Sequence, residues 1–334
     1  MREYRFAGTR GVLNPMAVAW LCCGCLLPAH TAAATWFGRF EVAAFHDDNL
    51  SRSELEADVQ SDNGLRLFAD GGRAFELENG NNLTLRASAQ YAAHDEFGGM
   101  DNFAAGAAAA WRKKFGLGNL APVLRFRVGA ERQEFDSRNR DGWLYRAEAS
   151  LGRRLSERWE VEAAVAYDAR RADEAVVAAG AGPGPGPGPG PGPGPGPGPG
   201  PGPGPGPGPG DEAKPGNVFD QDRLSLSLRG SLALAGPWLL SFGYTYFDGD
   251  VDSTASPNDA IIAAAEAITD DPLFGPGRVV YRLDAQGHVL GLDLDRALGE
   301  HDSLVLGWEL QTTRARGGID YDRQIVRLSY LHAF

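Results

Sequence analysis

Cysteine is scarce in this sequence and confined to its start. The three cysteines, Cys22, Cys23 and Cys25, all fall within the first 34 residues. If that stretch is removed from the mature protein, no thiol remains for a disulfide framework or a thiolate metal site. The chain also lacks the GxSxG, P-loop, dinucleotide-binding and HExxH motifs of common enzyme classes. We therefore expect no cofactor.

Long apolar runs and a basic charge balance are also absent. Beyond residue 34, no stretch approaches the roughly 18 consecutive apolar residues that a membrane-spanning helix needs. If this part of the chain crosses a membrane, it must do so as a closed β-barrel. The formal net charge of −12 disfavours a nucleic acid as partner, because binding to phosphates depends on Lys and Arg.

The first 34 residues have the order of a secretory signal. Three arginines among the first ten residues precede an apolar run, Met16–Ala29, and three alanines ending at Ala34 follow. This order predicts a signal peptide over residues 1–34, export through the Sec pathway and cleavage near Ala34. Cleavage as a lipoprotein at Cys25 is a weaker alternative, because Cys22 occupies a position where an aliphatic residue is usual.

Residues 35–334 alternate between apolar and polar side chains. In Leu290–Asp295, for example, every second residue is Leu and the residues between are Gly or Asp. The pattern predicts about twelve strands of roughly eleven residues, the length that a tilted strand needs to cross a bilayer. Short connections alternate with mostly longer, more acidic ones, as expected of periplasmic turns and extracellular loops.

Two stretches interrupt the regular pattern. In the second expected strand, Gly64–Leu77, strict alternation would place Arg73 beside leucines, so we expect a bulge at the glycine pair Gly71–Gly72. A second long loop is expected over Phe247–Gln286, with a short helix that starts near Ser256–Pro257.

The longest interruption contains an unbroken Pro-Gly alternation over residues 182–210. Glycine at every second position, rather than every third, excludes a collagen helix, and the absence of apolar side chains denies the segment a core. We expect a disordered, solvated spacer in an extracellular loop. It is either a stalk presented outward or, as we favour, an expanded repeat that an exposed loop tolerates.

Large aromatic residues gather at the two ends of the expected strands, on the apolar face. Four tryptophans adjoin the short turns: Trp36, Trp111, Trp159 and Trp238. Four further rings lie at the opposite ends: Tyr91, Trp143, Tyr167 and Tyr246. Rings with an apolar body and a polar edge are favoured at both interfaces of a membrane. The sequence therefore predicts two aromatic girdles.

The last fourteen residues, Tyr321–Phe334, form an alternating strand that ends on an aromatic ring. Phe334, Tyr330 and Leu328 share its apolar face, with His332 where an aromatic or aliphatic residue is more usual. This ending resembles the closing strand of Gram-negative outer-membrane β-barrel proteins, porin-like ones included. The resemblance rests on architecture and on this terminal strand, and it covers essentially all of residues 35–334.

The resemblance implies an all-β, up-and-down antiparallel transmembrane barrel in the bacterial outer membrane. It also implies that Phe334, Tyr330 and Leu328 form the signal that the barrel-assembly machinery reads, with the terminal strand pairing to the first. The expected partners are that machinery, periplasmic chaperones, outer-membrane lipid and lipopolysaccharide.

If the apolar faces meet lipid, the polar faces enclose the interior. The charged residues expected to line that lumen are Arg86, Arg125, Arg127, Arg146, Glu148, Glu160, Glu162, Arg229, Asp293, Asp295, Glu309 and Arg327. A field across a wet lumen would orient and select small charged solutes. The alternative is that neighbouring charges pair off and fill a narrow barrel, leaving no open pore.

Three functions follow from this reading. The leading hypothesis is a porin-like channel for small hydrophilic or charged solutes. The second is a structural or surface-display barrel with a closed lumen, whose acidic loops are solvated or bind divalent cations. The third, an outer-leaflet lipid hydrolase, is disfavoured: His94 beside Asp95 is suitably placed, but no Ser lies two residues away. We therefore expect no enzymatic activity.

Overall fold

The computed structural model describes residues 34–173 and 217–334. The expected signal peptide, residues 1–34, falls almost entirely outside these ranges, and the Pro-Gly repeat of residues 182–210 lies outside them as well. Within the described residues, no helix has both the length and the apolar character needed to cross a membrane.

Twelve long antiparallel strands of the described chain form one closed barrel, as predicted. They are β1 (Ala34–Asp47), β2 (Asp62–Glu76), β3 (Asn81–His94), β4 (Asn102–Lys114), β5 (Val123–Phe135), β6 (Gly142–Arg154), β7 (Trp159–Ala172), β8 (Gln221–Ala233), β9 (Trp238–Ala255), β11 (Val279–Ala297), β12 (Asp302–Ala315) and β13 (Ile319–Ala333). Each strand pairs with its neighbour along the chain, and β1 pairs with β13 to close the ring. The short strand β10 (Ala267–Asp270) pairs with the first residues of β11 and is not one of the twelve strands of the ring.

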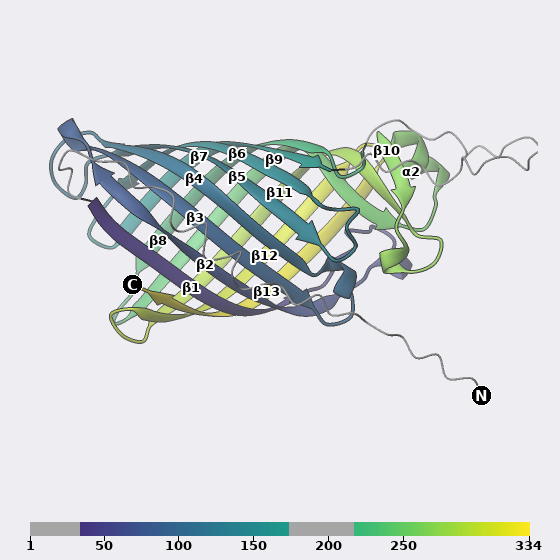
Figure 1. Ribbon diagram of the computed structural model, residues 1–334, viewed down its shortest axis with the longest axis horizontal. Coiled ribbons are helices and arrows are strands. Elements are labelled where there is room, and N and C mark those ends of the chain that lie inside the picture. The colour runs from purple at the N-terminus through teal and green to yellow at the C-terminus, as the bar shows by residue number, and fades with distance from the viewer. Residues whose placement is uncertain (1–33, 174–216) are drawn as a thin grey trace, which may run out of the picture. The chain divides into compact units, whose positions relative to one another are not determined.

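The two ends of the barrel differ, as Figure 1 shows. One end, called the turn end here, holds the start of β1, the C-terminus and the short connections. The other, called the loop end, holds the long connections after β1 and β9, together with β10 and the helix α2 (Asp259–Ala264). Short periplasmic turns and long extracellular loops are the usual arrangement in transmembrane barrels.

Alternating residues point outward and inward along the strands, as the sequence predicts. On β8, Leu224, Leu226 and Leu228 are about half exposed, whereas Ser225 between them is buried. The predicted girdle residues Trp36, Trp143 and Tyr167 are also exposed on the outer face. The outer surface is therefore apolar, and the polar side chains face the interior.

The seam between the first and last strands ends in a close backbone contact. The Gly38 N–H donates to the Phe334 carbonyl at 2.9 Å, and the Phe334 N–H donates to the Gly38 carbonyl at 3.0 Å. A Cβ atom on Gly38 would lie 2.2 Å from the Phe334 ring. The terminal ring therefore covers the place where a side chain at residue 38 would stand.

The bulge expected at Gly71–Gly72 is not present. Gly71 pairs with Gly38 and Gly72 pairs with Phe37 in an unbroken register. Arg73 therefore does point outward, and its guanidinium carbon lies 5.5 Å from the centre of the Trp36 ring. The prediction was wrong because an outward arginine at a strand end can stack on interface aromatic rings instead of entering the hydrocarbon.

The loop expected over Phe247–Gln286 is largely strand. β9 continues to Ala255 and β11 begins at Val279, and these two residues pair directly. Its short helix, α2, is capped by Asn258 rather than Ser256, since the Asn258 Oδ1 atom accepts from the Ala260 N–H at 2.9 Å. Apolar side chains on one face of the extended β9–β11 hairpin pack against Ile261 of α2 and form a small core. The hairpin residues are Phe247, Val251, Tyr281 and Leu283. This core explains the extension.

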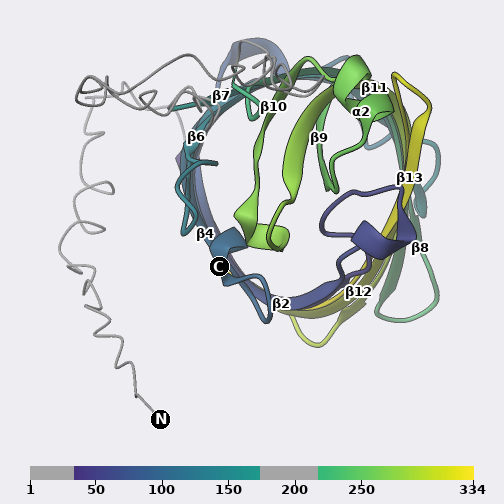
Figure 2. The same ribbon diagram turned by 90° about the vertical axis from the view of Figure 1, so that its right-hand side faces the viewer.

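The hairpin approaches the neighbouring strand closely at Gly249. This residue has a φ of 142°, and a Cβ atom there would lie 2.2 Å from the Asp222 carbonyl oxygen. Only glycine fits such a position. Figure 2 views the barrel from the loop end and shows the hairpin tip, α2 and the segment between β1 and β2 crossing the ring of strands.

Candidate functional site: the charged interior of the barrel

The residues predicted to line the lumen lie on the inward face of the strands. Arg125 on β5 contacts Glu162 on β7, reaching across β6 between them. Arg229 on β8 likewise approaches Glu148 on β6, with 3.8 Å between the Nη2 and Oε2 atoms. Pairs that pass over an intervening strand form on the concave side of a barrel, where side chains converge.

Most of the predicted lumen residues have an oppositely charged neighbour. The nitrogen–oxygen distances are 3.2 Å for Arg86–Asp70, 2.5 Å for Arg146–Asp168, 3.4 Å for Arg154–Glu160, 3.4 Å for Arg229–Glu162 and 2.6 Å for Arg327–Asp293. Asp295 accepts from the Ser303 hydroxyl at 3.4 Å, and Glu309 lines the cavity described below. Arg127 has no carboxylate within ion-pair distance in the described part of the chain. A transport role for these residues remains a prediction.

Several interior carboxylates were missed by the prediction. Asp70, whose side chain is 2 % exposed, accepts from Arg39 at 2.9 Å as well as pairing with Arg86. Asp47 is the last residue of β1, where it is buried and contacts Arg323. The signal that could have found both is their place on the inward alternation of their strands.

A cavity of about 480 Å³ lies inside the barrel toward the loop end. Its walls come from β5 to β9, from β11 to β13 and from the segment between β1 and β2. Polar and charged side chains make up most of the lining, including Arg146, Asp168, Arg223, Ser227, Thr245, Asp252, Glu309, Gln311 and Arg323. The space could therefore hold a small hydrophilic solute with its solvating water.

Two connections bridge the barrel above this cavity. They are loop 1 (residues 48–61) and loop 5 (residues 256–278). Loop 1 meets the β9–β11 hairpin where Arg52 contacts the carboxylate of Asp252 near the end of β9. The Ser253 hydroxyl donates to the Arg52 carbonyl at 2.8 Å, and the Thr254 N–H donates to the Ser51 carbonyl at 2.9 Å. Loop 1 is thus attached to the extended hairpin by hydrogen bonds to the backbone carbonyls of loop 1 and by an ion pair.

A second contact fixes loop 1 to loop 5 itself. The Asp58 carboxylate accepts from the Ser256 N–H at 2.6 Å and from the Ser256 hydroxyl at 3.0 Å. Arg278, at the other end of loop 5, also contacts Asp58. One buried carboxylate therefore joins both ends of loop 5 to loop 1.

A buried ion pair joins loop 5 to loop 3 (residues 136–141). The Arg140 Nη2 atom lies 2.6 Å from the Asp271 Oδ2 atom, and the two side chains are 3 % and 0 % exposed. The Thr254 hydroxyl donates to the same carboxylate at 2.8 Å, and the Arg140 guanidinium carbon lies 4.8 Å from the centre of the Phe219 ring. We call the assembly of loops 1, 3 and 5 the cap.

The charges in the cap shift one another's pKa values. Asp252 stands beyond the outer aromatic girdle, six positions after Tyr246. Burial alone would raise the pKa of Asp252, but the positive charges of Arg52 and Arg170 hold it well below its usual range. Asp252 in turn raises the pKa of Arg52. Both groups are therefore ionised at neutral pH.

The histidine considered for catalysis does not form a nucleophile–base pair. The His94 Nδ1 atom lies 3.6 Å from the Asp101 carboxylate, beyond hydrogen-bond distance, and its ring stands edge-on to Phe45. In loop 1, the Ser51 hydroxyl donates to the Asp58 carbonyl at 2.9 Å, so it is a structural group. Residues 34–173 and 217–334 contain no group of three or more His, Cys, Asp or Glu side chains placed to hold a metal ion.

Comparison with known proteins agrees with this architecture. No protein-family model matches the sequence, and no curated protein matches it. An outer membrane channel from Pseudomonas putida F1 superposes with a TM-score of 0.51 at 10 % identity, over 92 % of this chain and 97 % of that chain. The chain has the fold of a porin-like outer-membrane β-barrel.

Other outer-membrane barrels superpose less well. The NanC porin gives a TM-score of 0.45 at 9 % identity, over 88 % of this chain and 98 % of that chain. The outer membrane channel DcaP of Acinetobacter baumannii gives 0.41 at 8 % identity, over 91 % and 97 %.

Proposed function

We propose that this outer-membrane barrel is a porin-like channel that passes small, charged, hydrophilic solutes. The observation that carries the proposal is the polar cavity of about 480 Å³ inside the barrel, lined by side chains of both signs. Charges that face water inside a low-dielectric wall produce a field that orients and selects ions. The interior arginines and carboxylates are the groups that would contact a passing solute.

The cap sets the width of the proposed channel at the loop end. Loops 1, 3 and 5 are joined through Arg52, Asp58 and Arg140, each paired with a residue of the β9–β11 hairpin or of loop 5. A solute must pass beside these groups, so conduction is expected to be small in the wild-type protein. Displacing the cap is expected to increase it.

The cap also favours a second candidate, a barrel with a closed lumen that displays its loops. A buried ion pair such as Arg140–Asp271 holds its loops in one arrangement, because separating its partners leaves an unpaired charge in the interior. If the cap never opens, the interior charges serve only to fill the barrel. The loops would then contact lipopolysaccharide or other surface components.

Planar-bilayer recording distinguishes the two candidates. Because Ala255 pairs directly with Val279, residues 256–278 can be replaced by a two-residue Asn-Gly turn that closes the hairpin. In molar salt we expect a small conductance for the wild type and a larger one for this variant. Silence from both proteins, with each showing a heat-modifiable folded band, would reject the channel and leave the closed barrel.

The proposal includes the route to the membrane. Export through the Sec pathway, escort by periplasmic chaperones and recognition of Leu328, Tyr330 and Phe334 by the barrel-assembly machinery are parts of it. The hydrogen bonds between Phe334 and Gly38 support a role of the terminal residue in closing the barrel.

A further inference from the structure

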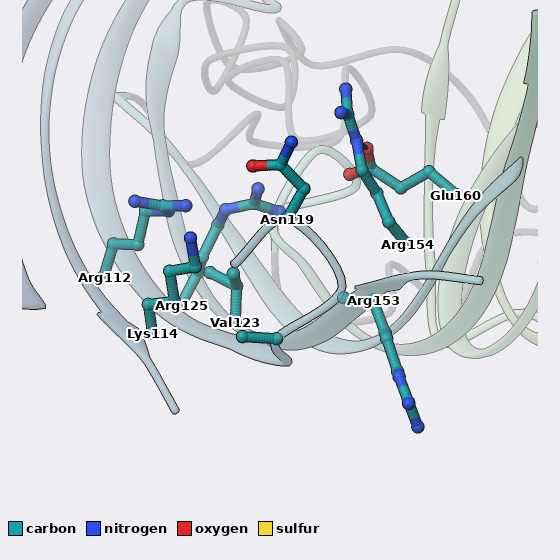
Figure 3. Close-up of a pocket in the computed structure, with 10 residues that line it drawn as sticks. Arg112, Lys114, Asn119, Val123, Arg125, Arg153, Arg154 and Glu160 are labelled. Atoms are coloured by element: carbon teal, nitrogen blue, oxygen red, sulfur yellow. Dashed lines mark hydrogen bonds and ion pairs between the residues drawn. The ribbon is translucent and has the colours of Figure 1, made fainter. Parts of the chain in front are cut away.

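A second, smaller pocket of about 250 Å³ lies at the turn end, away from the cap. The turn of residues 115–122 forms one part of its wall, and the ends of β4 and β6 with the starts of β5 and β7 form the rest. Its charged and amide side chains are Arg112, Lys114, Asn119, Arg125, Arg153, Arg154 and Glu160. In Figure 3, Arg112, Lys114 and Arg125 lie on one side, Arg154 and Glu160 on the other, and Arg153 points away.

Carboxylates neutralise only part of this positive charge. Arg154 lies 3.4 Å from Glu160, and Arg125 contacts Glu162. Arg112 and Lys114 form no ion pair with a carboxylate in the part of the chain that the structure describes. The pocket therefore keeps an excess of positive charge at its β4 side.

When the pocket is empty, the pairing of β4 with β5 leaves two positive charges beside each other, which is electrostatically unfavourable. Arg112 and Arg125 are directly opposite each other on β4 and β5, and like charges in that relation destabilise a sheet. Arg125 reaches its carboxylate past Gly152, where a Cβ atom would stand 3.4 Å from Glu162 and 3.6 Å from Arg125. Asn82, directly opposite Arg112 on β3, presents a neutral side-chain amide rather than a carboxylate.

The positive charge continues into the barrel. Arg127 lies two positions further along β5 on the same inward face, and within the described residues it forms no ion pair with a carboxylate. Cations on both walls of one small cavity, with no carboxylate paired to Arg112 or Lys114 among the described residues, are an arrangement that binds an oxyanion.

We propose that this pocket binds a small soluble anion that carries two or more negative charges on phosphate or carboxylate oxygens. Arg112 and Arg125 present planar guanidinium groups, which match two oxygens of such an anion, and Lys114 adds a compact positive charge. The volume of about 250 Å³ suits a small molecule rather than an extended chain. The site goes beyond the proposed channel function, because binding at the turn end does not require conduction.

Isothermal titration of the refolded full chain with inorganic pyrophosphate at low ionic strength tests the proposal. Lys114→Gln and Lys113→Gln form a matched pair: they remove the same charge from adjacent residues of β4. Lys113 points to the other face, with its Nζ atom 5.7 Å from the centre of the Phe115 ring. We expect Lys114→Gln to weaken pyrophosphate binding about tenfold, as the loss of one charge-assisted hydrogen bond does, and Lys113→Gln to leave it unchanged.

The double variant Arg112→Gln/Lys114→Gln is expected to lose binding, and acetate at the same ionic strength is expected not to bind. No binding of pyrophosphate to the wild type, or an equal loss in the Lys113 and Lys114 variants, would overturn the site. A heat-modifiable folded band confirms that each variant has folded. The bilayer experiment is independent: a silent barrel that binds pyrophosphate rejects the channel and keeps the site.

Discussion

The buried pair between Arg140 and Asp271 offers the sharpest test of the cap. In the variant Arg140→Met, the Asp271 carboxylate remains at a site where its side chain is fully buried. Removing one partner of a buried pair costs about 3–5 kcal/mol, and the remaining Thr254 hydroxyl places the expected cost at the lower end. About 3 kcal/mol corresponds to a more than hundredfold increase in the population of the open loop.

Hydrogen exchange measured by mass spectrometry on the refolded protein reports this opening. We expect peptides from loop 5 to exchange about a hundredfold faster in Arg140→Met, while peptides from the barrel strands keep their protection. The difference arises because the pair joins loops 3 and 5, and the strand residues bonded to it, Thr254 and Arg170, lie beyond Tyr246 and Tyr167 of the outer aromatic girdle.

The control is the variant Arg140→Met/Asp271→Val, which removes both charges; methionine is close to arginine in volume, and valine is only slightly larger than aspartate. Replacing a whole buried pair by apolar residues is often neutral, and a methionine can still pack on the Phe219 ring. The Thr254 hydroxyl loses its acceptor, at a cost of about 1 kcal/mol, so exchange within about tenfold of the wild type is expected. Unchanged exchange in Arg140→Met, or equally fast exchange in the double variant, would refute the reasoning.

Three further predictions concern the cap, the seam and the repeat. The pKa of Asp252 is lower in the folded state than in an unfolded chain. The ionised Asp252 carboxylate therefore stabilises the cap fully above about pH 4, and this stabilisation is lost as the pH falls toward the folded-state pKa. Exchange in loop 1 should thus be constant from about pH 8 to pH 5, after correction for the intrinsic rate, and rise in stronger acid; a rise already near neutral pH would contradict this. Gly38→Leu should displace the Phe334 ring and reduce the yield of heat-modifiable folded protein at least several-fold, whereas a yield equal to the wild type would show that the contact is dispensable. Deletion of residues 184–208, inside the Pro-Gly repeat, should leave membrane insertion unchanged, and loss of the folded band would show otherwise.

The barrel itself could be predicted from the sequence because its signal is local. Alternation with a period of two places each strand and both of its faces without knowledge of its neighbours. Trp36 and Tyr91 mark the two ends of the apolar face in the same way. The pattern failed at Arg73, where a charged side chain on the outer face is accommodated by the ring of Trp36.

The cap could not be predicted, because its contacts join residues far apart in the chain. Arg140 and Asp271 are separated by 131 positions, and Arg52 and Asp252 by 200. The stretch around Asp250 and Asp252 has the acidic composition of a solvated loop. Its carboxylate at Asp252 is paired with an arginine supplied by loop 1, which no local pattern reveals.

The anion pocket was only partly visible in the sequence. Arg125 and Glu160 were predicted to face the interior, and they do line the pocket. Arg112 lies on the inward face of β4, and its direct pairing with Arg125 follows from the register between β4 and β5. That register depends on the length and shape of the turn between the strands, which alternation alone does not determine.

The pairing of β1 with β13 has a consequence for biogenesis. The two edges that must meet are the first and the last parts of the sheet to be synthesised, so the cylinder cannot close before translation has finished. Until then, the two edge strands present unpaired backbone N–H and C=O groups beside an apolar surface, and this combination favours aggregation. The connectivity therefore makes aggregation a risk for every copy whose last strand has not yet paired with the first.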